Sequence, residues 1–106
     1  MNLKAFKIFC VIPAFNEEKT IVKVINDVKL FVDKVVVVDD CSGDDTLALL
    51  NNNFSSDSRV IILHHLVNRG QGAALETGTE YALKRGADII VHFDADGQFE
   101  AKDVAV

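Results

Sequence analysis

The sequence lacks the features that mark disulfide-bonded, membrane-spanning or nucleic-acid-binding proteins. Its two cysteines, Cys10 in an apolar run and Cys41 in a polar turn, form neither a disulfide framework nor a CxxC metal spacing, which predicts a reducing compartment. No apolar stretch reaches the roughly 18 residues that a membrane span needs, and the apolar run near the N-terminus is too short for a signal peptide. The longest basic cluster is Lys84-Arg85, so nucleic acid is not an expected partner. These absences predict a cytoplasmic chain with no membrane span.

The composition predicts one soluble globular unit over residues 1–106. Hydrophobic residues make up 49% of the chain and charged residues 25%. Sixteen acidic residues stand against eleven basic ones, which gives a formal net charge of −5. A chain of this length buries a real but small core, so we expect little stability in reserve.

Four short apolar runs predict strands, at residues 8–12, 35–38, 60–63 and 89–93. They are rich in β-branched residues and continuous, which is typical of strands covered on both faces in a parallel sheet. The segments between them are predicted to be helical over 21–32, over a second segment that starts at 42–45 and carries Leu47, Leu50 and Phe54 on one face, and over 73–85. One face of the third segment carries Ala74, Gly78, Tyr81 and Ala82. The small residues on this face predict a helix that lies close against the sheet. The order βαβαβαβ predicts an open three-layer α/β sheet.

Polar residues before the first two helical segments suggest where those helices begin. Asn16 is a suitable N-cap for the first, with Glu17 and Glu18 in its first turn to complement the helix dipole. Ser42 and Asp45 have the spacing of an acidic capping box for the second.

Ligands of such sheets bind beyond the carboxyl ends of the strands, so the residues after each apolar run are the candidates for function. Asp94 and Asp96 follow the fourth run at i and i+2 and can face one hard cation, to which Gln98 can add an amide oxygen. Oxygen ligands of this kind suit Mg²⁺ or Mn²⁺, which would also hold a diphosphate. The alternative is a solvated acidic turn, because a short D-x-D motif is often accidental.

The other candidate residues each have a structural and a functional interpretation. Of Asp39 and Asp40, one is expected to bond its own turn, with Asp40 the better candidate, and the other to accept hydrogen bonds from a base or ribose. Phe15 offers either a stacking surface or core packing. Glu17 could either contact a ligand from the helix start or interact favourably with the positive end of the helix dipole. The three histidines are expected at packing or edge positions, namely His64, His65 and His92.

Four motifs in this order resemble the nucleotide-binding half of a family 2 glycosyltransferase with the GT-A fold. They are Val11-Ile12-Pro13-Ala14-Phe15-Asn16-Glu17-Glu18, Val37-Val38-Asp39-Asp40-Cys41-Ser42-Gly43-Asp44-Asp45-Thr46, Asn68-Arg69-Gly70-Gln71-Gly72-Ala73-Ala74 and Asp94-Ala95-Asp96-Gly97-Gln98. The resemblance is strongest to the dolichol-phosphate mannosyltransferase and polyprenyl-phosphate glycosyltransferase group. It implies a Rossmann-like parallel sheet in the order 3-2-1-4 with helices on both faces.

The resemblance also implies a division of the site between nucleoside and diphosphate. The nucleoside pocket would be lined by Pro13, Phe15, Glu17, Val37 and Asp39. The diphosphate would be bound by Asp94, Ala95, Asp96 and Gln98, with Mg²⁺ or Mn²⁺ on Asp94, Asp96 and Gln98. Phe15 departs from the family, which often has Tyr there, so stacking is kept and a hydroxyl contact is lost.

The implied reaction is transfer of a sugar from a GDP- or UDP-linked donor to an acceptor, for which a polyprenyl phosphate is one candidate. Family members continue well past the D-x-D loop, so the resemblance implies an N-terminal nucleotide-binding part that binds nucleotide without catalysing transfer. No residue is assigned as the catalytic base. The full-length protein would work at the inner face of the membrane, and an uncovered sheet edge in the part would favour a homo-oligomer.

Three other folds are weaker matches to the same pattern. A phosphoacceptor receiver domain places its acidic pair after the first strand, whereas here the pair follows the second. A dinucleotide-binding oxidoreductase needs a Gly-rich loop where this chain has Pro13-Ala14-Phe15. A sugar nucleotidyltransferase also needs a Gly-rich, basic loop at that position.

Overall fold

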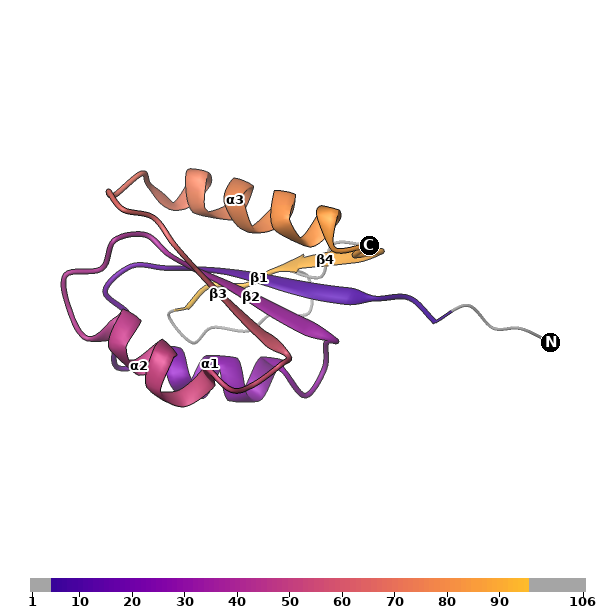
Figure 1. Ribbon diagram of the computed structural model, residues 1–106, viewed down its shortest axis with the longest axis horizontal. Coiled ribbons are helices and arrows are strands. Elements are labelled where there is room, and N and C mark those ends of the chain that lie inside the picture. The colour runs from indigo at the N-terminus through magenta and orange to yellow at the C-terminus, as the bar shows by residue number, and fades with distance from the viewer. Residues whose placement is uncertain (1–4, 96–106) are drawn as a thin grey trace.

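Four parallel strands form one sheet in the order β3-β2-β1-β4 (Figure 1). The computed structural model describes residues 5–95. The strands are β1 (Ile8–Ala14), β2 (Lys34–Asp39), β3 (Val60–His64) and β4 (Ile89–His92). The predicted parallel sheet and its strand order are confirmed.

Helices cover both faces of the sheet, as the continuous apolar strands predict. They are α1 (Ile21–Val28), α2 (Thr46–Phe54) and α3 (Gln71–Lys84). In Figure 1, α1 and α2 lie below the sheet and α3 lies above it. None of these three helices is long and apolar enough to cross a bilayer.

The two faces of the central strands build two separate cores. Cys10 and Ile12 of β1 pack with α1 and α2, whereas Val11 packs with α3. Both cores need apolar side chains, so β1 and β2 are apolar at successive positions instead of alternate ones. Burial also raises the pKa of the Cys10 thiol to about 12, so Cys10 belongs to the core as a neutral thiol.

The third helix lies close on the sheet because small residues face it. Ala74, Gly78 and Ala82 are its buried positions. A Cβ at position 78 would overlap Val11 Cγ1 and would lie 3.2 Å from Val38 Cγ2. Gly86, with φ of 88°, follows the helix in a conformation that favours glycine. The predicted small-residue face is therefore confirmed.

The first helix is shorter than the predicted 21–32, because it ends at Val28. Leu30 and Phe31 are 71% and 76% exposed in the turn that follows. Asp33 fixes this turn against β1, since its N–H donates to the Ile8 carbonyl and its carboxylate accepts the Ile8 N–H. These two hydrogen bonds set where β2 begins, and the chain leaves the helix to make them.

The predicted helix starts are wrong at both positions. Helix α1 begins at Ile21 and α2 at Thr46, with Thr20 and Asp45 before them and no side-chain cap on either. Asn16, Glu17 and Glu18 precede α1, and no acidic residue lies in its first turn. The predicted capping residues instead bind the neighbouring loop, as described below.

Candidate functional site

The carboxyl ends of the strands surround a cavity of about 540 Å³. Residues that follow all four strands line it, so segments far apart in the sequence contribute to one wall. Its lining consists of Pro13, Ala14, Phe15, Glu17, Asp40, Asn68, Gly70, Gln71, Asp94 and Ala95. This is the edge of the sheet at which open α/β folds bind their ligands.

The end of strand pairing explains why the cavity opens beside Pro13. Strand β4 pairs with β1 only as far as Val11, after which the Phe93 N–H donates to the Val11 carbonyl. The Ala14 carbonyl bonds on the other side, to the Asp40 N–H. Pro13 has the same parity as Val11, so its missing N–H faces the side where β4 has already ended. Proline is thus tolerated in a central strand, at the place where two strands separate.

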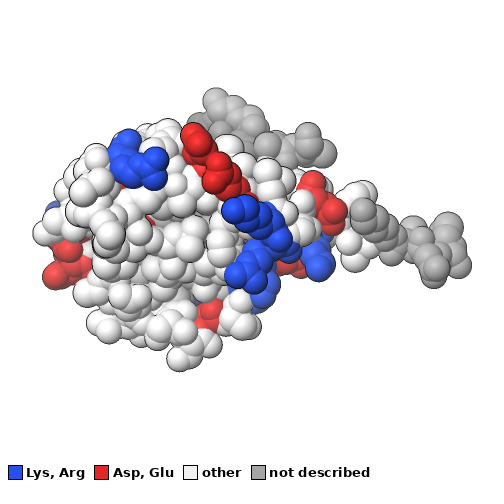
Figure 2. Space-filling view, turned by 45° about the horizontal axis from the view of Figure 1, so that its top comes forward, with Lys and Arg blue, Asp and Glu red and all other residues white. Residues whose placement is uncertain are grey.

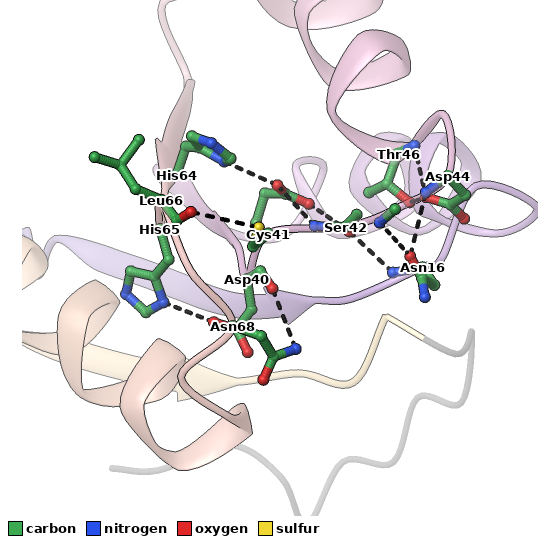
Figure 3. Close-up of polar contacts among 12 residues, drawn as sticks. Asn16, Asp40, Cys41, Ser42, Asp44, Thr46, His64, His65, Leu66 and Asn68 are labelled. Carbon is green, nitrogen blue, oxygen red and sulfur yellow. Dashed lines mark hydrogen bonds and ion pairs between the residues drawn. The ribbon is translucent and has the colours of Figure 1, made fainter.

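The loop after β1 is bound to the loop after β2 by side-chain hydrogen bonds, which Figure 3 shows around Asn16. Asn16 Oδ1 accepts the N–H groups of Gly43 and Asp44 at 2.7 and 3.3 Å, and the Asn16 N–H donates to Ser42 Oγ at 2.9 Å. Asn16 adopts φ of 54°, which asparagine tolerates better than most residues. The two loops, the first of which carries Phe15 and Glu17, therefore form one bonded unit.

Asp44 and Thr46 extend this unit toward Glu17. Thr46 Oγ1 accepts the Glu17 N–H at 2.9 Å and donates to Asp44 Oδ1, and the fully buried Thr46 also donates its N–H to Asp44. The Glu18 N–H donates to Asp44 Oδ2. Burial by itself would raise the pKa of Asp44, but the hydrogen bonds from Thr46 and Glu18 outweigh it and lower that pKa below its ordinary value. Asp44 is therefore a carboxylate that holds backbone groups in place.

Asp40 is a buried carboxylate on the cavity wall, with 3% of its surface exposed. It accepts the N–H groups of Arg69 and Gly70 at 2.8 and 2.7 Å, and His65 Nδ1 lies 2.8 Å from its Oδ1. Burial would raise the pKa of Asp40, but the hydrogen bonds from Arg69, His65 and Gly70 outweigh it and lower the pKa. The loop after β3 is thus attached to the residue after β2.

Asp39 and Val37 lie elsewhere than on the cavity lining. Asp39 is fully buried, and its carboxylate accepts hydrogen bonds from the Ser42 hydroxyl at 2.5 Å and from the Ser42 N–H at 3.4 Å, while His64 Nδ1 lies 3.0 Å away. Val37 is fully buried in the core with α1 and α2. Asp39 therefore stabilises the bonded loops through its hydrogen bonds with Ser42 and does not line the cavity.

The loop after β4 brings an exposed carboxylate to the cavity lining. Asp94 lines the cavity, and Gln71 Nε2 donates to its Oδ1 at 3.2 Å. The buried Ala95 also lines the cavity, and its carbonyl accepts the Thr20 hydroxyl, which ties this loop to the start of α1. The predicted ligands Asp96 and Gln98 lie outside the described residues.

The donor atoms at this wall suit a hard cation. Asp94 offers carboxylate oxygens, and the cavity lining within residues 5–95 includes no histidine and no cysteine. Oxygen donors without nitrogen or sulfur are those that Mg²⁺ and Mn²⁺ prefer. Within residues 5–95, no cluster of three His, Cys, Asp or Glu side chains forms a complete metal site. Asp94 is thus the one predicted ligand that the described chain places here.

The cavity is acidic. Glu17, Asp40 and Asp94 line it, and no Lys or Arg is among its lining residues in the described part of the chain. On the face that Figure 2 shows, basic and acidic side chains lie beside one another around a largely uncharged middle. An anionic ligand in this cavity would therefore need a cation or hydrogen-bond donors to accompany it.

The family resemblance included the Asn68–Ala74 motif after the third strand, but sequence reasoning assigned none of its residues to the site. Asn68, Gly70 and Gln71 line the cavity, and His65 forms a hydrogen bond with Asp40. The signal available was their position directly after the third apolar run, at the same edge of a parallel sheet. The histidines were expected at packing or edge positions, and His64 does end the edge strand β3; what the sequence did not reveal is that His64 and His65 both contact aspartates.

Comparison with known proteins agrees with the architecture. Residues 9–105 match the family described as Glycosyl transferase family 2. The UDP-N-acetylglucosamine--dolichyl-phosphate N-acetylglucosaminyltransferase of Methanococcus voltae is 40% identical over 111 residues, which span 92% of this chain and 44% of that protein. The undecaprenyl-phosphate mannosyltransferase of Micrococcus luteus is 30% identical over 100 residues, with 92% and 41% covered.

A solved structure has the same arrangement. A mannosyltransferase from Pyrobaculum calidifontis, in complex with GDP-Man and Mn²⁺, superposes with a TM-score of 0.72 at 25% sequence identity. The match covers 92% of this chain and 29% of that one. The chain thus spans about two-fifths of the length of the curated relatives that it matches.

Proposed function

This chain belongs to glycosyl transferase family 2, and we propose that its cavity binds the nucleotide-sugar donor of a glycosyl transfer reaction. One observation carries the proposal: a single cavity at the carboxyl edge of the sheet combines an aromatic surface, a buried hydrogen-bond acceptor and an exposed carboxylate. These are the groups that a base, a ribose and a metal-bound diphosphate require.

The nucleoside would occupy the side of the cavity formed after β1 and β2. Phe15, 45% exposed, offers a face for stacking, and Pro13 and Glu17 line the same wall. Asp40 offers a carboxylate acceptor for a base N–H. Val37 and Asp39, which the family resemblance also assigns to the nucleoside, would act through the residues in front of them.

The diphosphate would lie on the side formed after β4, near Asp94 and Ala95. We propose that Asp94, with Asp96 and Gln98, holds a Mg²⁺ or Mn²⁺ ion there. Such an ion would supply positive charge against the leaving diphosphate. This role accounts for an anionic ligand in a cavity whose described lining is acidic.

The whole protein would transfer the sugar to a polyprenyl phosphate at the cytoplasmic face of a membrane. The names of the relatives from Methanococcus voltae and Micrococcus luteus support this acceptor class. The acceptor must be positioned against the donor for transfer to occur, which needs more chain than the cavity described here.

Binding titrations of GDP, UDP, GDP-mannose and UDP-N-acetylglucosamine, with and without Mn²⁺, test the proposal. We expect one base to be preferred and its diphosphate to bind at least tenfold more tightly with Mn²⁺. An Asp94→Asn variant should lose most of that dependence, and Asp57→Asn, far from the cavity, serves as the matched control. Tight nucleotide binding that ignores the metal would refute the diphosphate assignment, and no binding of any nucleotide would refute the donor site.

A further inference from the structure

His65 is a buried histidine whose two ring nitrogens both have partners. It follows β3 directly and is 7% exposed. Its Nδ1 lies 2.8 Å from Asp40 Oδ1 and its Nε2 lies 2.8 Å from Thr77 Oγ1. Figure 3 shows the ring pointing toward Asp40. The ring therefore connects α3, where Thr77 lies, to the carboxylate on the cavity wall.

The chemistry of Asp40 fixes the direction of its hydrogen bond with His65. An ionised carboxylate only accepts, so His65 Nδ1 carries the proton and donates to Asp40. Nε2 then pairs with the Thr77 hydroxyl, which can either donate a hydrogen bond to it or accept one from it. The line runs from Thr77 through His65 to Asp40, and each group in it is satisfied.

The hydrogen bonds on Asp40 leave one oxygen with room for a ligand. Oδ1 accepts from His65 and from the Arg69 N–H, which occupies both of its lone pairs. Oδ2 accepts the Gly70 N–H at 2.7 Å, and a carboxylate oxygen can accept a second hydrogen bond. Asp40 lines the cavity, so a donor on a ligand could complete Oδ2.

We propose that His65 is a positioning residue for the donor nucleoside. Held by Thr77, it fixes the rotation of the Asp40 carboxylate, so that Oδ2 is available to an N–H of the base while the Arg69–Gly70 backbone stays on the wall. The ligand chemistry is a ring N–H beside a carbonyl, which guanine and uracil both have. This inference rests on the proposed function of the cavity.

Two substitutions at position 65 separate the His65–Asp40 hydrogen bond from the His65–Thr77 hydrogen bond. The amide nitrogen of asparagine can take the place of Nδ1, so His65→Asn keeps a donor to Asp40 and loses Thr77. Glutamine reaches toward the position of Nε2, so His65→Gln keeps Thr77 and loses the donor to Asp40. Thr77→Val and Thr77→Ser form a second pair, which removes or keeps the hydroxyl on α3 without changing His65.

Nucleotide affinity is the first measurement, made on the full chain with GDP, UDP and pyrophosphate in the presence of Mn²⁺. We expect His65→Gln to weaken binding of the preferred nucleoside diphosphate by about tenfold or more, and His65→Asn by less than about threefold. Thr77→Val should lie between them, with Thr77→Ser close to the original chain. Pyrophosphate affinity should stay unchanged in all four variants. A parallel loss of pyrophosphate binding would mean general loosening and would overturn the proposal.

Amide hydrogen exchange at Arg69 and Gly70 is the second measurement, and it needs no ligand. Protection of these two amides should fall in His65→Gln and persist in His65→Asn, because only the first releases the Asp40 carboxylate. Equal protection and equal affinity in the two variants would overturn the positioning role. If the exchange pattern holds while no nucleotide binds the original chain, the positioning of Asp40 stands and the proposed function fails.

Discussion

Asp39 and Asp40 are adjacent in the sequence, yet the structure gives them different surroundings. Asp39 faces Ser42 and His64, whereas Asp40 faces His65 and the loop after β3 and lines the cavity. Successive residues at a strand end point to opposite faces, so a one-residue difference decides which carboxylate lines the cavity. From the sequence, Asp39 was the expected base contact and Asp40 the turn residue. The histidines that contact these two aspartates each lie 25 residues further along the chain, and sequence patterns do not reveal such pairs.

Because Asp40 lines the cavity and Asp39 does not, we predict that substitution of Asp40 has the larger effect on nucleotide affinity, the opposite order to the one expected from the sequence. Replacing Asp40 by Asn removes the charge and turns one acceptor into a donor, so we expect nucleotide affinity to fall about ten- to a hundredfold, equivalent to about 1.5–3 kcal/mol. Asp39→Asn should have the smaller effect on affinity, because Asp39 acts through Ser42. Isothermal titration of both variants, with circular dichroism to confirm folding, measures the difference. A larger loss in a folded Asp39→Asn variant would return the base contact to Asp39.

Gly78 tests how closely α3 must approach the sheet. Adding a methyl group there forces Val11 or the helix to move, because the new Cβ would overlap Val11 Cγ1. We expect Gly78→Ala to lower the free energy of unfolding by about 1–3 kcal/mol, despite the better helix propensity of alanine. Gly72→Ala is the control, since it lies in the same helix with nothing within 4 Å of its Cβ, and it should be neutral or stabilising by up to about 1 kcal/mol. Urea unfolding curves of the two variants measure both, and equal curves would contradict the close packing.

At the scale of elements, the strands and the face of α3 could be predicted, and the starts of α1 and α2 could not. Strand and helix interiors follow from local periodicity, which the apolar runs and Gly78 express directly. Asn16 and Ser42 have the right residue types for helix caps, but each binds the other loop instead. Capping preferences describe a helix by itself, and here a tertiary hydrogen bond takes the same side chain. Residues at the ends of all four strands line the cavity, whereas the sequence analysis assigned site residues only at the ends of the first, second and fourth strands.

Thr46 links the two loops and gives a prediction at this scale. Thr46→Val keeps the shape of a fully buried side chain but loses the hydroxyl that donates to Asp44 and accepts the Glu17 N–H. We expect the free energy of unfolding to fall by about 1–3 kcal/mol and nucleotide affinity to fall with it, because Glu17 lines the cavity. Thr46→Ser keeps the hydroxyl and is the control. Chemical unfolding and nucleotide titration check both effects, and a Val variant as stable as the Ser variant would refute the link.

At the scale of the whole molecule, the hydrogen-bonded aspartates make the folded state less stable in acid. Burial by itself would raise the pKa values of Asp40 and Asp44, but hydrogen bonds from backbone and side-chain donors outweigh burial and lower both pKa values. The Arg59 N–H and then Lys29 lower the pKa of Asp57 on the opposite side of the sheet from α3. A carboxyl with a lowered pKa in the folded state binds fewer protons there than in the unfolded chain. Its contribution to stability is therefore complete above the ordinary value of 3.8 and is lost as the pH falls through the lowered value.

We therefore expect the free energy of unfolding to be nearly constant from about pH 7 to pH 5 and to decline steeply between about pH 4 and pH 2. Urea unfolding at intervals of half a pH unit measures this profile. Asp44→Asn should be less stable than the original chain at pH 7 and should show a shallower decline in acid, because the group whose protonation costs stability has been removed. Asp27→Asn, on the exposed face of α1, should leave the slope as it is. A parallel acid profile in the Asp44 variant would show that Asp44 gains no stability from its ionised form, in contradiction to its hydrogen bonds with Thr46 and Glu18.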